Sequence, residues 1–442
     1  MTGYWAEHAW LPNGPAASVR LTVDGDRFTR VEPRAHAEPG DVLLSGVVLP
    51  GLANTHSHAF HRALRGRTHG GAGNFWSWRE QMYAVTRRLT PDTYLALARA
   101  TYAEMALAGT TAVGEFHYVH HAPGGKRYAD PNAMGEALAQ AATEAGIRLT
   151  LLDTCYLSGG LTGDGHLEPD AVQQRFSDRS VEAWQTRMSQ RRPAEGVRLG
   201  AAIHSVRAVP RDALAAIAGA VEGQPLHVHL SEQPAENIAC QVYYGCTPTQ
   251  LLEETGVLRA DLTAVHATHL QDADIELLGA HGSQAAFCPT TERDLADGIG
   301  PAHQLAQAGV SLSLGSDQHA VIDPFEELRG LEMHERLASN ERGRFSPSQL
   351  VRAASANGYR SLGWFGGGVL AAGALADLVA VRDDTIRTVG SKASQIVYSA
   401  TAADVHTVMV AGRLVVERGE HLRLGSVAPL LRDAFDLLRE GA

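Results

Sequence analysis

The sequence VVLPGLANTHSH, at residues 47–58, begins as an apolar strand and ends in two histidines, His56 and His58. Side chains two positions apart on a strand point to the same side, so these two imidazoles can face one ion. Seven further apolar segments follow along the chain, and a helical pattern separates each segment from the next. The segment at 47–58 is therefore predicted to be the first strand of a parallel sheet.

The eight strand segments and the helices between them predict a closed barrel. Doubly wound open sheets often carry a glycine-rich phosphate turn, but no GxGxxG or GxxxxGK[ST] motif follows a strand segment here. Eight successive β-then-α units favour a (β/α)8 barrel of the TIM type. The strands are predicted at 47–58, 110–116, 147–157, 197–206, 225–232, 262–269, 283–291 and 310–318. The helices are predicted at 91–108, 133–145, 180–191, 210–222, 248–255, 272–281, 301–308, 325–338 and 347–361.

The two ends of the chain show a different pattern. Residues 18–48 and 375–418 alternate apolar and polar positions between turn residues, which is typical of short antiparallel strands. We therefore expect an α/β protein, a (β/α)8 TIM-type barrel with a smaller β-sandwich domain built from both chain ends. The predicted boundaries are 1–47 and 368–424 for the discontinuous β domain, 48–367 for the barrel and 425–442 for a C-terminal helix.

Composition limits the class of ligand. The 442 residues include 38 Lys and Arg against 49 Asp and Glu, a formal net charge of −11, and contain no basic run. We therefore expect neither a nucleic acid nor a membrane as partner, but a small molecule. The four cysteines form no CxxC pair, and no apolar run approaches the ~20 residues of a membrane span. A cytoplasmic location is the simplest expectation.

Polar side chains stand where the predicted barrel strands end, which is the active-site face of such barrels. Three imidazoles and one carboxylate suit a divalent ion such as Zn²⁺ and leave a position for water. The scattered cysteines disfavour a closed structural zinc site. The strand-end residues are His56 and His58 on the first strand, His229 and Glu232 on the fifth, His266 and His269 on the sixth, and Asp317 on the eighth.

Four motifs, PGLANTHSH, HVHLSE, VHATH and GSD, resemble the amidohydrolase superfamily of metal hydrolases. The resemblance covers nearly the whole chain and implies a (β/α)8 barrel with a β domain from both chain ends. It implies that the metal-associated residues are His56, His58, His229 and Asp317. His266 would then lie next to the attacking water or the substrate, and His269 would be a bystander.

One metal ion is predicted in each subunit, with zinc favoured by the ligand types. Many members of the superfamily hold two metals bridged by a carboxylated lysine at a strand end. The lysines of this chain, Lys126 and Lys392, both lie outside the predicted strand ends. Glu115 ends the second strand and offers an alternative bridging carboxylate, although a structural, hydrogen-bonded role fits it equally well.

Glu232 is the candidate proton shuttle, because it lies three residues beyond His229 where the fifth strand gives way to a loop. This arrangement resembles the deaminases of the superfamily, in which such a glutamate protonates the expelled nitrogen. A metal lowers the pKa of water to about 7 and so supplies hydroxide at neutral pH. Asp317 is expected to orient that water and His266 to stabilise the attacking oxygen.

Further motifs predict the substrate class. NTHSHAFHRALRG, NFWSWREQMY, VGEFHYVHH, HSVRAVP and HLSEQ resemble deiminases that release ammonia from the formimino group of a dicarboxylate in histidine degradation. A dicarboxylate requires local arginines in a chain of net charge −11. The predicted substrate-binding residues are Arg207, Arg79, His204, Tyr118 and His61. The deiminases that these motifs resemble carry Gln at the position of His61.

Two other functions stay open at this stage. One is a related aminohydrolase acting on a purine, pyrimidine or guanidine compound, which would use aromatic stacking more than paired arginines. The other is a barrel that has lost catalysis and serves as a scaffold, which the intact strand-end residues disfavour. The aromatic segment with Trp76, Trp78 and Tyr83 predicts a lid or an oligomer contact, and the resemblance implies a homodimer.

Overall fold

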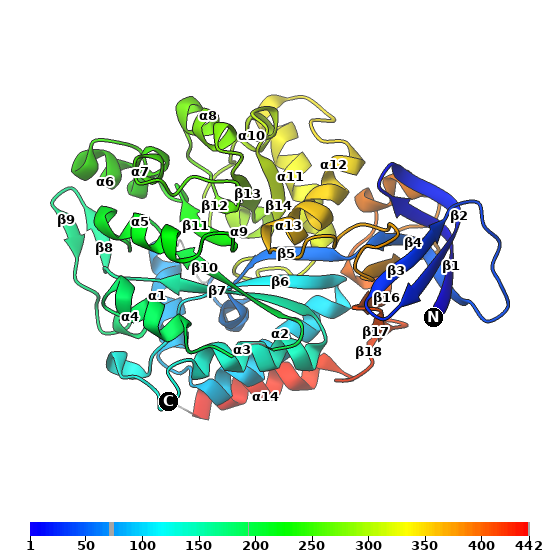
Figure 1. Ribbon diagram of the computed structural model, residues 1–442, viewed down its shortest axis with the longest axis horizontal. Helices are drawn as coiled ribbons and strands as arrows, with labels where there is room; N and C mark the ends of the chain where they lie inside the picture. The colour runs from blue at the N-terminus through cyan, green and yellow to red at the C-terminus, as the bar shows by residue number, and fades with distance from the viewer. Residues whose placement is uncertain (70–74, 193, 441–442) are drawn as a thin grey trace.

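Eight parallel strands lie side by side at the centre of the molecule (Figure 1). The computed structural model describes residues 1–69, 75–192 and 194–440. The strand order is β14-β13-β12-β11-β10-β7-β6-β5, and a parallel bridge between Ser57 and Asp317 joins β5 to the end of β14. The predicted barrel is confirmed, and each predicted strand overlaps one of these. They are β5 (Leu52–Ser57), β6 (Thr110–His117), β7 (Arg148–Cys155), β10 (Val197–Ile203), β11 (Leu226–Leu230), β12 (Leu262–His266), β13 (Gln284–Phe287) and β14 (Ser311–Leu314).

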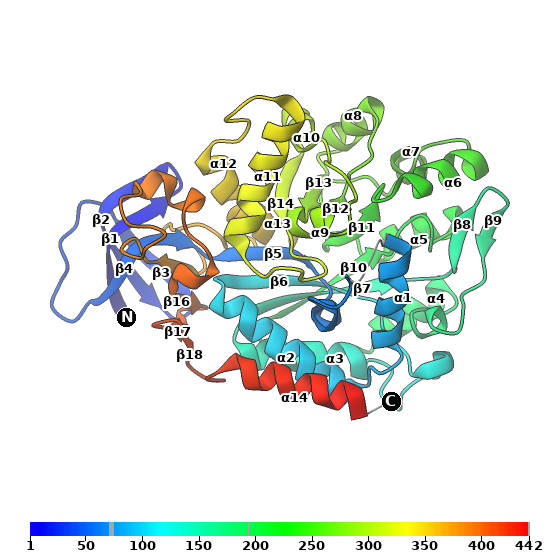
Figure 2. The ribbon, with the colours of Figure 1, turned by 180° about the vertical axis from the view of Figure 1, so that it is seen from behind.

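Helices surround the barrel, and the largest hydrophobic core lies between them and the strands (Figures 1 and 2). They are α1 (Phe75–Thr86), α2 (Pro91–Leu107), α3 (Ala133–Ala145), α4 (Val181–Met188), α5 (Arg211–Ala220), α6 (Pro234–Tyr244), α7 (Pro248–Glu254), α8 (Asp272–Ala280), α9 (Pro289–Asp294), α10 (Ala302–Gln307), α11 (Pro324–Ser339), α12 (Pro347–Arg352), α13 (Gly358–Ser361) and α14 (Val427–Glu440). The helix predicted at 347–361 is α12 and α13 joined by a π-helical turn at Ala353–Asn357. A small hairpin, β8 (Gly160–Thr162) and β9 (Gly165–Leu167), follows β7.

Helix α6 is absent from the helices predicted above, and its burial explains why. Its buried side chains include Glu236 and Cys240, whereas Ile238, Val242 and Tyr243 are exposed. An apolar periodicity points to a buried helix face only when the apolar side chains are the ones that are buried. In α6 the buried face instead carries the carboxylate of Glu236, which pairs with Arg207, a residue of the cavity described below.

The predicted strand at 47–58 is two strands that meet at Gly51. Strand β4 (Val42–Pro50) belongs to the outer sheet, and β5 belongs to the barrel. The Gly51 amide donates to the Asp377 carbonyl at 3.0 Å, and a Cβ at Gly51 would lie 2.5 Å from Thr111 Oγ1. Glycine therefore permits the close packing at which the chain passes from one sheet to the other.

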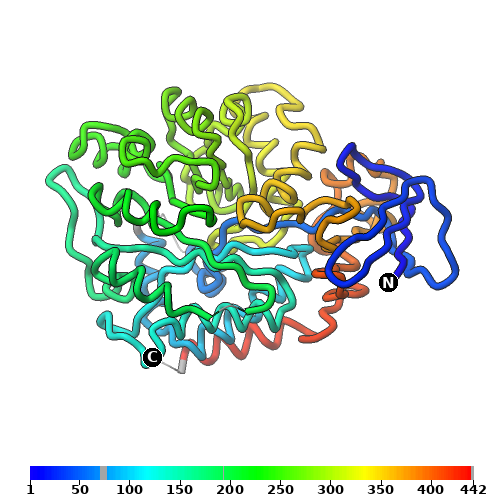
Figure 3. Tube along the Cα trace, viewed as in Figure 1, coloured from blue at the N-terminus to red at the C-terminus, as the bar shows by residue number. Residues whose placement is uncertain are grey.

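The strands of both chain ends form one eight-stranded sheet beside the barrel, as expected (Figure 3). Its order is β18-β17-β16-β15-β4-β1-β2-β3; β1 and β4 pair in parallel, and the other neighbours pair antiparallel. A buried ion pair between Arg148 of β7 and Asp377, 2.7 Å apart, ties this sheet to the barrel. The remaining strands are β1 (Thr2–Leu11), β2 (Gly14–Asp24), β3 (Arg27–Glu32), β15 (Leu378–Val381), β16 (Val405–Val410), β17 (Arg413–Glu417) and β18 (Glu420–His421).

The last helix, α14, runs along α2 on the outside of the barrel (Figure 2). Ala434 and Leu438 are buried, and the Phe435 ring lies 5.8 Å and 5.1 Å from the guanidinium carbons of Arg62 and Arg67. Of the helices in the described ranges, none combines the length and apolar character that a membrane crossing needs.

Candidate active site

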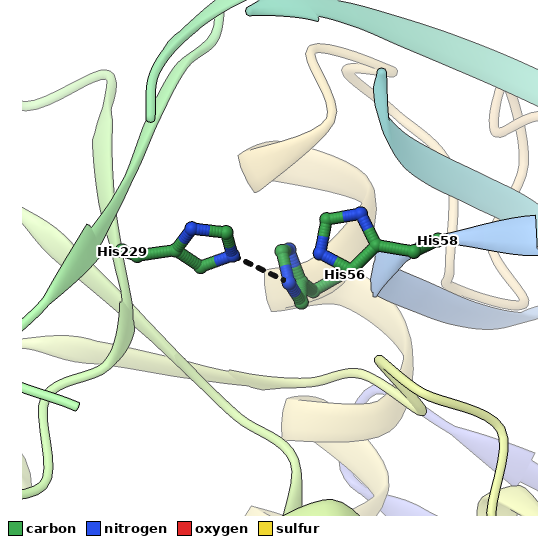
Figure 4. A group of neighbouring side chains, drawn as sticks. All are labelled: His56, His58 and His229. Carbon is green, nitrogen blue, oxygen red and sulfur yellow. Dashed lines mark hydrogen bonds between the residues drawn. The ribbon is translucent and has the colours of Figure 1, made fainter. Parts of the chain in front are cut away.

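Four side chains from three strand ends converge at the top of the barrel, and we call them the ligand cluster: His56, His58, His229 and Asp317. Nε2 of His56 lies 3.1 Å from Nε2 of His229 and 3.2 Å from Asp317 Oδ1. Nε2 of His58 lies 3.4 Å from the same Asp317 oxygen. Figure 4 shows the imidazoles of His56 and His58, from the end of β5 and the residue after it, facing the imidazole of His229 on β11. The structure thus brings together the four residues predicted to be metal ligands.

Backbone carbonyls fix the tautomers of two of these imidazoles. Nδ1 of His58 donates to the Phe116 carbonyl at 2.9 Å, and Nδ1 of His229 donates to the His204 carbonyl at 3.0 Å. Each Nε2 therefore carries a lone pair aimed into the cluster, the arrangement that metal-binding histidines commonly show. Nδ1 of His56 is buried without a hydrogen-bond partner among the described residues. Imidazole lone pairs and a carboxylate oxygen are donors that fit a divalent ion such as Zn²⁺.

Burial sets the protonation states of the cluster. It lowers the pKa of His56 to about 3 and that of His58 to about 4, and it lowers the pKa of His229 well below its ordinary value. Burial would raise the pKa of Asp317, but the hydrogen bond from His56 and the nearby imidazoles hold it well below its usual range. Neutral imidazoles and an ionised carboxylate are the forms that bind a metal.

His266, at the end of β12, lies between two carboxylates. Its Nε2 is 3.7 Å from Glu232 Oε1, and its Nδ1 is 3.7 Å from Glu292 Oε1. Burial alone would lower the pKa of His266, but the nearby carboxylates of Glu232, Glu292 and Asp317 raise it to about 10. His266 also adopts a positive φ of 69°, a strained conformation that is concentrated at functional sites.

A cavity of about 490 Å³ opens above the ligand cluster. Its wall includes all three predicted catalytic residues, Glu232, His266 and Asp317. It also includes all five residues predicted to bind substrate, which are His61, Arg79, Tyr118, His204 and Arg207. Groups predicted from separate segments of the sequence therefore share one chamber of a size typical of small-molecule sites.

The two arginines are held differently. Nε of Arg79, on α1, donates to the Tyr83 hydroxyl at 2.8 Å, and its guanidinium lies over the Tyr83 ring at 4.9 Å. The Arg207 guanidinium forms ion pairs with Glu232 at 3.4 Å and with Glu236 at 2.9 Å. Arg79 thus rests on an aromatic side chain, whereas Arg207 links the candidate proton shuttle to helix α6.

The histidine and tyrosine groups of the wall also contact one another. His61 Nε2 lies 3.1 Å from the Tyr118 hydroxyl, and the His204 ring packs edge-on against Tyr118 and Tyr156. Burial lowers the pKa of His61 and of His204 well below the ordinary value, so both imidazoles are neutral near pH 7.

Other candidates lie outside this chamber. His269 is half-buried and does not line the cavity, while Lys126 and Lys392 lie at or near the surface. Glu115 is fully buried, and it accepts hydrogen bonds from Ser57 Oγ at 2.6 Å and the Ala59 amide at 2.7 Å. Within α1, Trp78 and Tyr83 line the cavity, and the side chain of Trp76 lies outside the described residues.

Sequence reasoning missed Glu236 and Glu292. Both follow a barrel strand by a few residues, on α6 and α9, and both are buried. The only available signal was a carboxylate shortly after a strand end, and acidic residues in surface loops commonly share that signal.

The fold and the converging side chains are those of a hydrolase of the amidohydrolase type. The chain belongs to that family, because the model of the Amidohydrolase family matches residues 47–415. Within the family, it is 38% identical over 440 residues to the formimidoylglutamate deiminase of Pseudomonas aeruginosa, covering 95% of this chain and 96% of that protein. The predicted family is confirmed, and the chain is a hydrolase that acts on C–N bonds.

Other relatives carry different substrate names. The 5-methylthioadenosine/S-adenosylhomocysteine deaminase of Pelotomaculum thermopropionicum is 28% identical, over 93% of this chain and 92% of that protein. A crystal structure of an amidohydrolase from Brucella melitensis superimposes with a TM-score of 0.90 and 32% identity, covering 99% of this chain and 100% of that one. A zinc-bound adenosine deaminase structure from Xanthomonas campestris shares the fold, with a TM-score of 0.84, 23% identity and coverage of 100% and 98%.

Proposed function

We propose that this chain is a deiminase that hydrolyses N-formimino-L-glutamate to N-formyl-L-glutamate and ammonia. The observation that carries the proposal is the cavity in which Arg79 and Arg207 accompany Glu232, His266 and three members of the ligand cluster, which are His58, His229 and Asp317. The two guanidinium groups can each pair with one carboxylate of a dicarboxylate substrate. Glu232 and His266 supply the proton donor and the positive charge that hydrolysis of a C=N bond needs. The 38% identical relative named formimidoylglutamate deiminase supports the same substrate.

His56, His58, His229 and Asp317 would hold one divalent ion, and zinc is the ion we propose. When bound, such an ion lowers the pKa of water toward neutrality and polarises the atom under attack. The ligand atoms of the three histidines lie within 4.8 Å of one another, and the contacts of Asp317 with His56 and His58 complete the set.

Glu232 and Asp317 are the proposed proton-transfer groups, and His266 is the proposed stabiliser of charge. Water oxygen adds to the formimino carbon as the C=N bond becomes a single bond, and the first proton that water loses passes through Glu232 to the terminal nitrogen. The remaining hydroxyl proton then passes through Asp317 and Glu232 to the same nitrogen, the bond between carbon and that nitrogen breaks, and ammonia leaves while the oxygen becomes the carbonyl of the formyl group. The His266 imidazolium, 3.7 Å from Glu232, stabilises the negative charge that develops on the attacking oxygen.

Arg79 and Arg207 would bind the two substrate carboxylates, and the neutral groups would complete the contacts. His204, Tyr118 and His61 offer hydrogen bonds to a carboxylate or to the amidine nitrogen. Arg207 already contacts Glu232 and Glu236, so a bound carboxylate would compete with these partners for its five N–H groups.

An ammonia-release assay across formimino, guanidino and heterocyclic amino compounds tests the substrate. With one equivalent of Zn²⁺, we expect release from N-formimino-L-glutamate at a kcat/KM far above that for any other compound. The aromatic wall, which includes Tyr83, Tyr156 and Phe176, supports a purine aminohydrolase as the second candidate. A zinc-loaded sample that deaminates only heterocyclic amines would overturn the first proposal in favour of the second.

The Glu232→Gln variant tests the chemical step. We expect kcat to fall by about 10²- to 10⁴-fold, while the zinc content measured by atomic absorption stays at one per chain. Glu168→Gln, which changes an exposed carboxylate on the same cavity wall, is the matched control and should retain full activity. Full turnover by Glu232→Gln would remove the proposed shuttle.

We further propose that the enzyme is a cytoplasmic homodimer. The absence of a CxxC pair and the implied likeness to dimeric deaminases support this proposal. Analytical ultracentrifugation of the purified chain tests the oligomeric part, since a single species of 47.2 kDa would contradict it.

A further inference from the structure

A series of buried polar side chains, linked by hydrogen bonds, joins β5 to β6 and to the loop after β14. Ser57 stands between His56 and His58, so its side chain points to the other face of β5. Its hydroxyl lies 2.6 Å from Glu115 Oε2 and 3.2 Å from His319 Nε2. The five members are buried, and we call them the seam network: Asn54, Ser57, Glu115, Ser316 and His319.

The other half of the seam network ends at Asn54. His319 Nδ1 lies 2.9 Å from Ser316 Oγ, which in turn accepts from Asn54 Nδ2 at 2.6 Å. Oδ1 of Asn54 accepts the Ser316 amide at 3.0 Å. Five side chains from β5, β6 and the loop after β14 are therefore joined by consecutive hydrogen bonds.

The end groups give these hydrogen bonds one direction. Asn54 Oδ1 already accepts the Ser316 amide, so the Asn54 side chain can only donate to Ser316 Oγ. Ser57 has a single hydroxyl proton and donates it to Glu115, so Ser57 accepts from His319 Nε2, and Nδ1 of a neutral His319 then accepts from Ser316. The carboxylate of Glu115 completes the sequence as an acceptor, and it also accepts the Ala59 amide at 2.7 Å.

Three of the predicted metal ligands, His56, His58 and Asp317, lie beside members of the seam network in the sequence. The Asp317 amide donates to the His56 carbonyl at 2.9 Å, and the His58 amide donates to the Asp317 carbonyl at 3.1 Å. Asp317 and His319 hold positive φ values of 42° and 58°, which non-glycine residues retain only when their surroundings over-determine them. The hydrogen bonds of the seam network supply those surroundings.

We propose that the seam network positions Asp317 against His56 and His58, with His319 and Ser57 as its central positioning residues. This inference rests on the proposed metal site. Loss of the network would let the loop after β14 move away from β5, so Asp317 would no longer lie close to His56 and His58. Groups that orient metal ligands in this way typically change metal affinity by about 10- to 100-fold when mutated.

Zinc affinity, measured by competition with a chromophoric chelator, tests the proposal without substrate. We expect Ser57→Ala and His319→Leu to weaken zinc binding by about 10- to 100-fold. His319→Gln keeps one donor and one acceptor, so it should recover most of the affinity. Ser355→Ala is the control, because Ser355 is equally buried but donates to the Val351 carbonyl at 2.6 Å.

The absorption spectrum of the Co²⁺-substituted protein gives a second readout, since its visible bands report ligand geometry. We expect altered bands in Ser57→Ala and His319→Leu, and wild-type bands in Ser355→Ala. Wild-type zinc affinity and wild-type bands in both seam variants would overturn the inference. Zinc bound normally by the wild type without ammonia release would instead count against the proposed substrate, and a wild type that binds no zinc would remove both.

Discussion

Two buried polar clusters lie at strand ends of this barrel, and they differ in how their charges are satisfied. The ligand cluster gathers three neutral imidazoles around the Asp317 carboxylate. The second cluster, which we call the arginine network, lies around the carboxyl end of β7 and consists of Asp153, Asp178, Arg187 and Arg191. It pairs two carboxylates with two guanidinium groups of the same chain.

The arginine network is complete without a ligand. Nη2 of Arg187 lies 2.8 Å from Asp153 and 2.7 Å from Asp178, Arg191 contacts Asp153, and Trp184 donates to Asp153 at 2.9 Å. The ligand cluster instead directs lone pairs and a negative charge at one point. A buried charge requires a partner, so the arginine network serves the fold, whereas the ligand cluster is the site at which we propose that an ion binds.

The largest expected effect comes from breaking the arginine network. Asp153→Asn leaves two buried guanidinium groups with one carboxylate, which typically costs about 3–5 kcal/mol. Urea denaturation with a metal chelator present would measure this loss of unfolding free energy. The control is Asp384→Asn, since Asp384 pairs with Arg382 on the surface and its loss should leave the unfolding free energy almost unchanged. Equal losses in the two variants would contradict the distinction drawn between buried and exposed pairs.

The stabilisation of the folded protein by zinc should depend on the ligand cluster and not on the arginine network. A saturating ion at about 100 times its dissociation constant stabilises the folded state by about 2.7 kcal/mol. We expect zinc to raise the unfolding free energy of the wild type and of Asp153→Asn by this amount. His229→Ala should gain far less, because one donor of the ligand cluster is lost. A zinc effect that survives His229→Ala would place the ion elsewhere.

The ligand cluster could be predicted from the sequence for a geometric reason. Strand ends of a parallel barrel meet at one face, so the positions of His56, His229 and Asp317 after their strand segments are enough to bring them together. The arginine network could not be predicted in this way, because Arg187 and Arg191 lie at the end of the predicted helix at 180–191 and reach Asp153 only through tertiary packing. In the sequence, their charges resemble those of ordinary surface residues.

The fold likewise contains features that the sequence predicts and features that it does not. Parallel strands of buried residues give a strong apolar signal, and each of the eight overlaps a predicted segment. The break at Gly51 is missed because it depends on Thr111 and Asp377, two distant residues that pack against it. Helix α6 is missed because its exposed face is apolar. Both features depend on contacts between residues that are far apart in the sequence, so no short stretch of the sequence predicts them.

Acid should destabilise the protein through the arginine network. Burial alone would raise the pKa of Asp153, but Arg187 and Arg191 hold it well below the ordinary 3.8. A carboxylate with a lowered folded-state pKa contributes its full stability above the unfolded-state pKa, and this stability is lost as the pH falls toward the folded-state value. Below about pH 4, we expect each such group to cost about 1.4 kcal/mol per pH unit.

Urea denaturation at pH values from about 5 to about 2, again with chelator, measures this slope. Asp153→Asn has one titrating group fewer, so its unfolding free energy should fall less steeply with decreasing pH than that of the wild type. Parallel slopes in the two proteins would show that Asp153 does not titrate as its surroundings require.

The smallest expected effect lies in the cavity, at His61. This imidazole is buried and neutral, and it lies 3.1 Å from the Tyr118 hydroxyl. His61→Gln exchanges one neutral hydrogen-bonding group for another, so we expect KM for N-formimino-L-glutamate to change less than about threefold. His61→Leu removes the hydrogen bond and should raise KM by about two- to tenfold, the equivalent of about 0.5–1.5 kcal/mol. Both variants should keep the urea midpoint of the wild type, because His61 is a neutral group outside the arginine network. A large loss of stability in His61→Gln would instead place this residue with the groups that hold the fold together.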